Sequence, residues 1–269
     1  MSRSVNRSRW SIVALSCAGA ALVAAFVLGP AALLRGRYPQ FQDQSVMSEL
    51  LGRGLVDYWG SGVRTYPPGL AEMVDYWFEW HAIKIVISVL LTAVLGLLAA
   101  TLWRRSLWRR SLTAGVGCVV AAATTTVLSL FSVFVAVLNI QSTVAPVVAL
   151  LPMLSADNAD GQTAQSLIEN GVQSGDSRPP LLELLTQVEH YNWAAIVATA
   201  VVIAVVATGT VTAFRLYRSS DTTNGAHCRM FVALGSLGAV MTIAMALLFV
   251  AAVVAVVDPG EALLGAVGL

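Results

Sequence analysis

Long runs of apolar residues alternate with polar segments along the whole chain. A helix needs about 20 mainly apolar residues to cross the hydrocarbon core of a bilayer, and its backbone polar groups must be paired there. The runs lack the alternation of apolar and polar residues that is typical of a membrane-spanning strand. The pattern therefore predicts an all-α, polytopic integral membrane helical bundle with about five transmembrane helices, at 10–34, 81–103, 112–138, 193–214 and 231–257.

The charged residues divide unevenly between the polar segments that connect these spans. Ten of the sixteen basic residues lie in the segments at 1–9, 104–111 and 215–230. Fourteen of the fifteen acidic residues lie in the segments at 35–80, 139–192 and 258–269. Short loops rich in Arg and Lys stay in the cytoplasm. We therefore predict a multi-pass protein of the plasma membrane with its N-terminus in the cytoplasm and its C-terminus outside.

The two long outer segments contain further helical patterns. Residues 67–80 and 179–193 each open with a Pro-Pro pair and end on Trp. Pro is favoured in the first turn of a helix, so we expect short amphipathic helices on the outer membrane face. Residues 45–59 show a helical stripe of apolar positions. Residues 155–177 are rich in Asp, Asn, Gln, Ser and Gly, and we expect an exposed, mobile loop there.

The two halves of the chain resemble each other at a spacing of 113 residues. Trp80 and Trp193 are 113 apart, and so are Arg105 and Arg218. The Pro-x-x-Ala-Leu-Leu motif at Pro146 recurs 113 residues later. The matches suggest a parallel internal repeat, in which an outgoing helix, an outer segment and a returning helix form one unit. The chain would hold two units and the start of a third. Chance similarity between Ala-, Leu- and Val-rich runs is the alternative.

Composition agrees with a membrane location. Hydrophobic residues make up 57% of the chain and charged residues 12%, against about 25% charged in soluble domains. Scattered basic residues and a net charge of +1 do not indicate a nucleic-acid partner. The first apolar run exceeds the 7–15 residues of a signal-peptide core, so we expect an uncleaved helix. We expect the chain to contact the lipid bilayer and either a protein partner or a second copy of itself.

Two histidines are candidate cofactor ligands. His81 and His190 lie near the outer starts of returning helices, in corresponding parts of the two repeats. Two such imidazoles could ligate a haem or a metal if their helices packed side by side. Interfacial histidines without a function are the commoner case, and the sequence leaves the cofactor unknown.

Other polar residues could form a site at or within the membrane. Glu72, Asp75 and Glu79 are spaced to share one helix face, where they would gather cations or simply be solvated. Lys84 lies one turn inside a span and could extend to the headgroups. Three neighbouring hydroxyls lie near the middle of the third span, at Thr124, Thr125 and Thr126.

Small and hydroxyl-bearing residues also follow one face of the second span. Ser88, Thr92 and Gly96 are spaced by four residues, which places them on the same face of a helix. Small residues allow two membrane helices to approach closely, and hydroxyls can bond between them. The stripe therefore indicates helix packing, and a polar pathway is the alternative.

Three functional classes remain from the sequence. The centres of the spans carry no ionisable residue, although transport pathways usually do. No nucleotide-binding loop, nucleophile elbow or HExxH motif is present. We therefore favour a non-catalytic subunit, scaffold or accessory of a membrane assembly over an enzyme. The alternatives are a small-solute transporter or channel, and an outer-face haem- or metal-binding membrane enzyme.

Overall fold

The computed structural model describes residues 2–108, 112–155, 157–219 and 225–268, and within them it contains helices and no strand. Five of the described helices are long and apolar enough to cross a membrane. This confirms the predicted all-α fold class and its five spans. Arg109, Arg110 and Asp221, which entered the charge pattern, lie outside the described residues.

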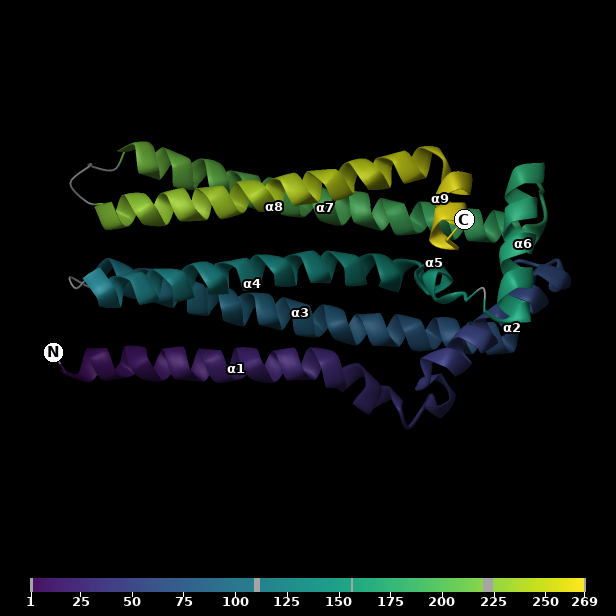
Figure 1. The fold of residues 1–269 in the computed structure, drawn as a ribbon, viewed down its shortest axis with the longest axis horizontal. Coiled ribbons are helices and arrows are strands. Elements are labelled where there is room, and N and C mark those ends of the chain that lie inside the picture. Colours follow the sequence, from purple (N-terminus) through teal and green to yellow (C-terminus); the bar gives the residue numbers. More distant parts are fainter. Residues whose placement is uncertain (1, 109–111, 156, 220–224, 269) are drawn as a thin grey trace. The chain divides into compact units, whose positions relative to one another are not determined.

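Five long helices and six short ones make up the described chain (Figure 1). The long helices are α1 (Ser2–Leu34), α3 (Pro68–Trp108), α4 (Leu112–Val144), α7 (Pro179–Ser219) and α8 (Gly225–Val257). The short ones are η1 (Pro39–Phe41), α2 (Gln44–Ser61), α5 (Pro146–Leu150), η2 (Leu151–Met153), α6 (Ala159–Ser174) and α9 (Pro259–Ala266). The helix expected from the stripe at 45–59 is α2.

The two amphipathic segments are helical, but neither forms a separate helix. Residues 68–80 are the first turns of α3, and residues 179–193 are the first turns of α7. Each helix begins at a proline, whose missing N–H is not needed in a first turn. Both helices continue without a break into the span that follows, because no Pro or Gly interrupts the junction at Trp80 or at Trp193.

The loop expected at 155–177 is wrong, because most of this segment forms α6. The Asn158 side chain caps its N-terminus by accepting a hydrogen bond from the Gly161 N–H, and Gly175 ends it in a left-handed conformation at φ 63°. Its buried positions recur at helical spacing but hold mostly small residues, at Gly161, Ala164, Ile168 and Gly171. A buried face with so little apolar side chain gives no hydrophobic stripe in the sequence.

The chain divides into two compact units, which are described separately. Unit 1 comprises residues 1–28, 85–137 and 199–247. Unit 2 comprises residues 29–84, 138–198 and 248–269. Each long helix contributes residues to both units.

In unit 1, the small-residue stripe of α3 packs against α4. The Ser132 hydroxyl donates a hydrogen bond to the Ser88 carbonyl at 3.0 Å, and the Ser129 hydroxyl donates one to the Thr92 carbonyl at 3.2 Å. A Cβ on Gly96 would lie 3.7 Å from the Ser129 hydroxyl oxygen. The stripe therefore serves helix packing, as small and hydroxyl residues do in membrane bundles.

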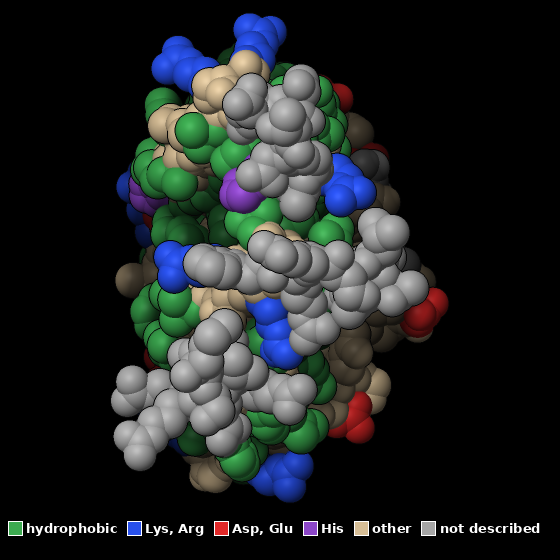
Figure 2. All heavy atoms as spheres, turned by 90° about the vertical axis from the view of Figure 1, so that its left-hand side faces the viewer, with side chains coloured by type: hydrophobic (Ala, Val, Ile, Leu, Met, Phe, Trp, Pro, Cys, Tyr) green, Lys and Arg blue, Asp and Glu red, His purple; other side chains and the backbone are tan. Residues whose placement is uncertain are grey.

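Unit 1 also carries the ends of the helices that meet the Arg-rich segments. Arg104, Arg215, Arg218 and Arg229 are exposed. Figure 2 shows basic side chains on this face among hydrophobic ones. The side chains of the N-terminal arginines lie outside the described residues.

Unit 2 has a hydrophobic core of its own. It is built from α2, α6, α9 and the connecting segments, together with the parts of the long helices that belong to this unit. Leu51, Tyr58, Leu150, Leu184 and Leu263 are fully covered within it. A core drawn from so many segments holds the polar parts of unit 2 in one arrangement, since close-packed interiors tolerate little displacement.

Candidate functional site

Helices α2 and α6 of unit 2 cross at very short range, and we call the pair the α2–α6 platform. A Cβ on Gly52 would lie 2.8 Å from the backbone nitrogen of Gly161, which is closer than real side chains approach. Both residues are buried. Glycine is therefore required at this crossing, because only a residue without a Cβ lets the two backbones approach so closely. Figure 1 shows α6 running across the direction of α7.

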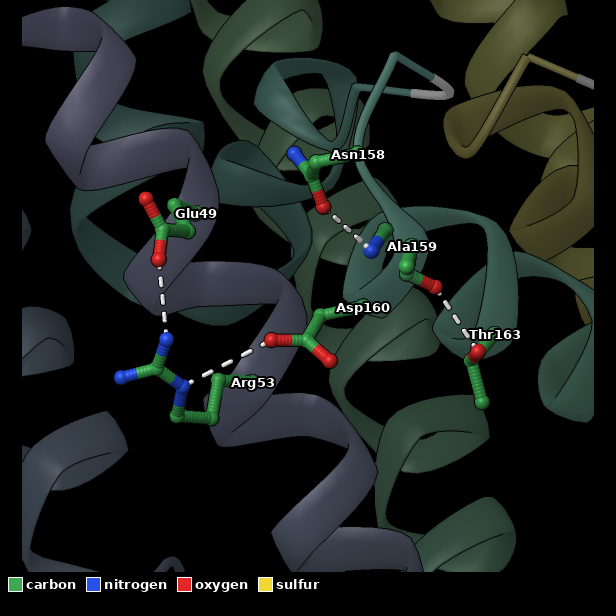
Figure 3. A network of polar contacts seen from close by, with 7 residues as sticks. Glu49, Arg53, Asn158, Ala159, Asp160 and Thr163 are labelled. Carbon is green, nitrogen blue, oxygen red and sulfur yellow. Dashed lines mark hydrogen bonds and ion pairs between the residues drawn. The ribbon is translucent and has the colours of Figure 1, made fainter.

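Polar contacts join the two helices beside the crossing. The Arg53 guanidinium donates to Glu49 at 2.8 Å on its own helix and lies 3.5 Å from the Asp160 carboxylate on α6 (Figure 3). The Ser48 hydroxyl donates to the Met153 carbonyl at 2.8 Å, which ties α2 to the segment before α6. Arg53 is 55% exposed, so solvent weakens its ion pairs.

The ends of the two platform helices are capped alike. Asp43 begins α2 by accepting a hydrogen bond from the Ser45 N–H, and Asn158 does the same for α6 with the Gly161 N–H. Hydrogen bonds from the Ser45 hydroxyl and from the backbone N–H groups of Ser45 and Val46 stabilise the Asp43 carboxylate and lower its pKa. Gly62 ends α2 at φ 64°, and Gly175 ends α6 at φ 63°. Left-handed glycines are frequent helix ends because they carry no Cβ.

Trp59, near the end of α2, contacts α6 and the residue that precedes α7. A Cβ on Gly171 would lie 2.7 Å from the indole ring of Trp59. The Arg178 guanidinium lies 4.8 Å from the centroid of an indole ring of Trp59 and is hydrogen-bonded to Asp176. This bond lowers the pKa of Asp176. The indole of Trp59 is therefore held by a glycine and by a cation–π contact.

Two tyrosines lie beside the C-terminal end of α2. The rings of Tyr58 and Tyr66 meet edge to face, with centroids 5.0 Å apart. The Tyr58 hydroxyl donates to the Arg64 carbonyl at 3.0 Å. Burial, with the negative charge of Glu183 as a smaller cause, raises the pKa of Tyr58 to about 12. Burial raises the pKa of Tyr66 as well. Both phenols therefore stay protonated over the whole neutral range.

The acidic residues of α3 hold the segment that connects α1 to α2. Glu79 forms an ion pair with Arg37 and accepts a hydrogen bond from the Tyr38 hydroxyl at 3.2 Å. Glu72 accepts one from the Gln40 amide at 2.8 Å. Asp75, between them on the helix, is exposed. Two of the three predicted cation-binding carboxylates thus make contacts that fix a connection between helices.

The two candidate haem or metal ligands lie in different surroundings. His81 is half-buried, its Nδ1 lies 2.9 Å from the Trp77 carbonyl oxygen, and its ring lies against Trp77 with centroids 4.8 Å apart. His190 on α7 is exposed. Within the described residues, no three His, Cys, Asp or Glu side chains are grouped to hold a metal ion.

The remaining candidates lie at scattered positions. The Lys84 amine lies 5.3 Å from a ring centroid of Trp80. Thr124 is exposed, whereas the Thr125 and Thr126 hydroxyls donate to the carbonyls of Ala121 and Ala122. The Thr126 oxygen also accepts a hydrogen bond from the Trp103 indole at 3.1 Å. The three threonines therefore face different surroundings.

Unit 2 is strongly acidic. It holds 14 of the 15 acidic residues and 6 of the 16 basic ones, which gives a formal charge of −8. Three of the six basic residues, Arg37, Arg53 and Arg178, are in ion pairs within the unit. Exposed carboxylates on or beside the platform include those of Asp57 and Asp157. The net field around the platform is therefore negative and attracts cationic groups.

Comparison with protein-family models, with curated proteins and with solved structures found no match for this chain. Sequence reasoning missed Gly52, Gly161 and Gly171, which determine the platform. Gly52 is not part of the apolar stripe expected in 45–59, and its place directly after Leu50 and Leu51 of that stripe is the one sequence signal that it could be buried.

Proposed function

We propose that this multi-pass membrane protein is a non-catalytic subunit or scaffold, and that the α2–α6 platform receives a protein partner outside the plasma membrane. The observation that carries the proposal is the glycine-to-glycine crossing of α2 and α6, with a Cβ position on Gly52 only 2.8 Å from Gly161. Two helices locked at this distance present a fixed surface. A preformed surface binds a partner at a lower entropic cost than a flexible loop.

The roles of the other polar residues support a scaffold. Glu72 and Glu79 hold the connection between α1 and α2, and His81 contacts the Trp77 carbonyl. A catalytic group must instead be within reach of a substrate, next to a base or an electrostatic stabiliser. These side chains stabilise the fold of unit 2, which favours a binding role for this unit over a catalytic one.

The charge of unit 2 favours a basic partner surface. A formal charge of −8 raises the association rate with a cationic protein and discriminates against an acidic one.

The proposed orientation of the chain in the membrane rests on the distribution of charged residues between the two units. Unit 1 holds ten basic residues and one acidic residue, and Arg-rich short segments remain in the cytoplasm. Unit 2 then lies outside, where a partner reaches the platform.

We further propose that the chain arose by internal duplication. Helices α4 and α8 end 113 positions apart, at Val144 and Val257, and the helices that follow them, α5 and α9, begin 113 positions apart, at Pro146 and Pro259. The left-handed caps Gly62 and Gly175 are also 113 positions apart. These equal spacings support two repeated units, in which α2 and α6 are equivalent, followed by the start of a third in α8 and α9.

Site-specific photocrosslinking in intact cells tests the partner proposal. A photoreactive residue at Asn170, which is exposed on α6, should give one discrete protein adduct. The matched control places the photoreactive residue at position 240 on α8. Val240 is 66% exposed in unit 1 and should contact lipid. Reversal of charge with Asp57→Lys and Asp157→Lys should weaken the Asn170 adduct. No adduct at Asn170, or equal adducts at both positions, would contradict the proposal.

A further inference from the structure

Unit 1 contains an apolar cleft between α1, α3 and α4, which we call the α1 cleft. Its volume is 490 Å³. None of the residues that line it is charged, and most are apolar, including Ala20, Phe26, Leu91, Leu95, Leu128 and Phe131. The α1 part of unit 1 is held loosely, because Gly19 is its one buried residue between positions 10 and 28.

The hydroxyls of the cleft offer little to a polar ligand. Thr125 donates its proton to the Ala121 carbonyl, and Ser132 donates to the Ser88 carbonyl. The Ser88 hydroxyl has no hydrogen-bond partner among the described residues, but Ser88 is only 1% exposed, and Ser16 is the remaining hydroxyl of the lining. Water does not fill a cavity that lacks several polar partners for it. An empty gap of this size would forfeit the van der Waals contacts that hold membrane helices together. The occupant is therefore apolar.

The dimensions of the cleft select a hydrocarbon chain over a helix. The lining runs along α1 from Ser16 to Phe26, which spans about 15 Å of helix. A volume of 490 Å³ lies within the range of about 300–1,000 Å³ that is typical of small-molecule pockets. A helix with its side chains is about 10–12 Å across and would occupy on the order of 1,200–1,700 Å³ over the same length. A single hydrocarbon chain, about 4–5 Å wide by its contact distances, fits this space.

We propose that the α1 cleft binds one acyl chain of a membrane lipid, which completes the packing of α1 against α3 and α4 within unit 1. Because no charged residue lines the cleft, the chain and not the headgroup determines binding. Binding should depend on acyl-chain length up to the length of the cleft. Lipids with anionic and zwitterionic headgroups should bind alike.

Native mass spectrometry of the purified full chain tests this site. After delipidation, the protein is mixed with phosphatidylglycerol or phosphatidylethanolamine of defined chain length. Ala20→Phe places a ring in the cleft, whereas Ala18→Phe places the same ring at an exposed position of α1 that does not line it. We expect one retained lipid in the wild type and in Ala18→Phe, and at least tenfold less in Ala20→Phe. Added lipid should raise the Tm of the first two proteins only.

A second variant separates loss of the site from loss of folding. Leu128→Trp fills the cleft from α4 and should also abolish retention, with the helical circular dichroism of the wild type as the check on folding in each variant. Equal retention by Ala18→Phe and Ala20→Phe would overturn the proposal. Affinity that follows headgroup charge, or a second copy of the chain that Ala20→Phe displaces, would overturn it as well.

Discussion

The backbone of Gly52 in α2 approaches that of Gly161 in α6 so closely that a Cβ on Gly52 would lie 2.8 Å from the Gly161 nitrogen. Two helices that are separated by more than 100 positions in the sequence are thereby fixed against each other. The crossing makes the α2–α6 platform one surface, and the proposed partner binding depends on it.

Substitution of Gly52 tests the crossing. Gly52→Ala must push α2 away from α6, because the contacting atoms belong to the backbone and cannot rotate aside. We expect the free energy of unfolding to fall by about 1–3 kcal/mol, as for other overpacked interiors. Denaturant titration of the purified protein in detergent measures this change.

The control for Gly52→Ala is Gly60→Ala on the same helix. No atom lies within 4 Å of a Cβ added at Gly60. Alanine has the higher helix propensity, so this variant should be neutral or more stable by up to about 1 kcal/mol. Equal destabilisation by the two variants would contradict the close crossing.

Removal of the ion pairs across the platform should lower the free energy of unfolding much less than Gly52→Ala does. Arg53 contacts Glu49 and Asp160, but its side chain is 55% exposed. Arg53→Ala should therefore lower the free energy of unfolding by less than about 1 kcal/mol, and added salt should shrink the difference. A loss as large as that of Gly52→Ala would show that charge rather than close packing holds the platform.

The five spans follow from the sequence because membrane insertion depends on local hydropathy. The α2–α6 platform could not be predicted in this way, because it depends on contacts between residues that are far apart in the sequence. Gly161 and Gly171 resemble loop residues until Gly52 and Trp59 are known to lie against them. The role of Glu79 likewise depends on Arg37, which lies 42 positions away. The contact of His81 with Trp77 is local, at a separation of one helical turn, and could have been anticipated.

Alkaline pH should destabilise unit 2 through its buried phenols. Burial raises the pKa of Tyr58 from 10.0 to about 12, so the folded state retains its proton more strongly than the unfolded state. The associated stability is fully present below pH 10.0 and is lost as pH rises toward about 12. Tyrosinate absorbance and denaturant titration measure both effects. Tyr58→Phe should reduce this pH dependence, and an unchanged profile would contradict the assignment.

The proposed orientation predicts which side of the membrane each unit occupies. In a background where Cys17, Cys118 and Cys228 are replaced by Ala, Asp57→Cys should react with an impermeant maleimide on intact cells. Arg104→Cys should react only after the cells are permeabilised. Both positions are exposed in the structure. The reverse pattern would place the platform in the cytoplasm.

The measurement that tests the central claim most directly is the mass of the intact assembly, extracted from membranes in a mild detergent. The proposal predicts a complex in which this chain and a second protein occur in fixed stoichiometry. It also predicts that Asp57→Lys with Asp157→Lys dissociates the complex, whereas Glu189→Lys, a change at an exposed acidic position on α7, leaves it intact. A wild-type chain that is extracted alone, or a complex that survives charge reversal and Gly52→Ala, would contradict a partner-binding platform.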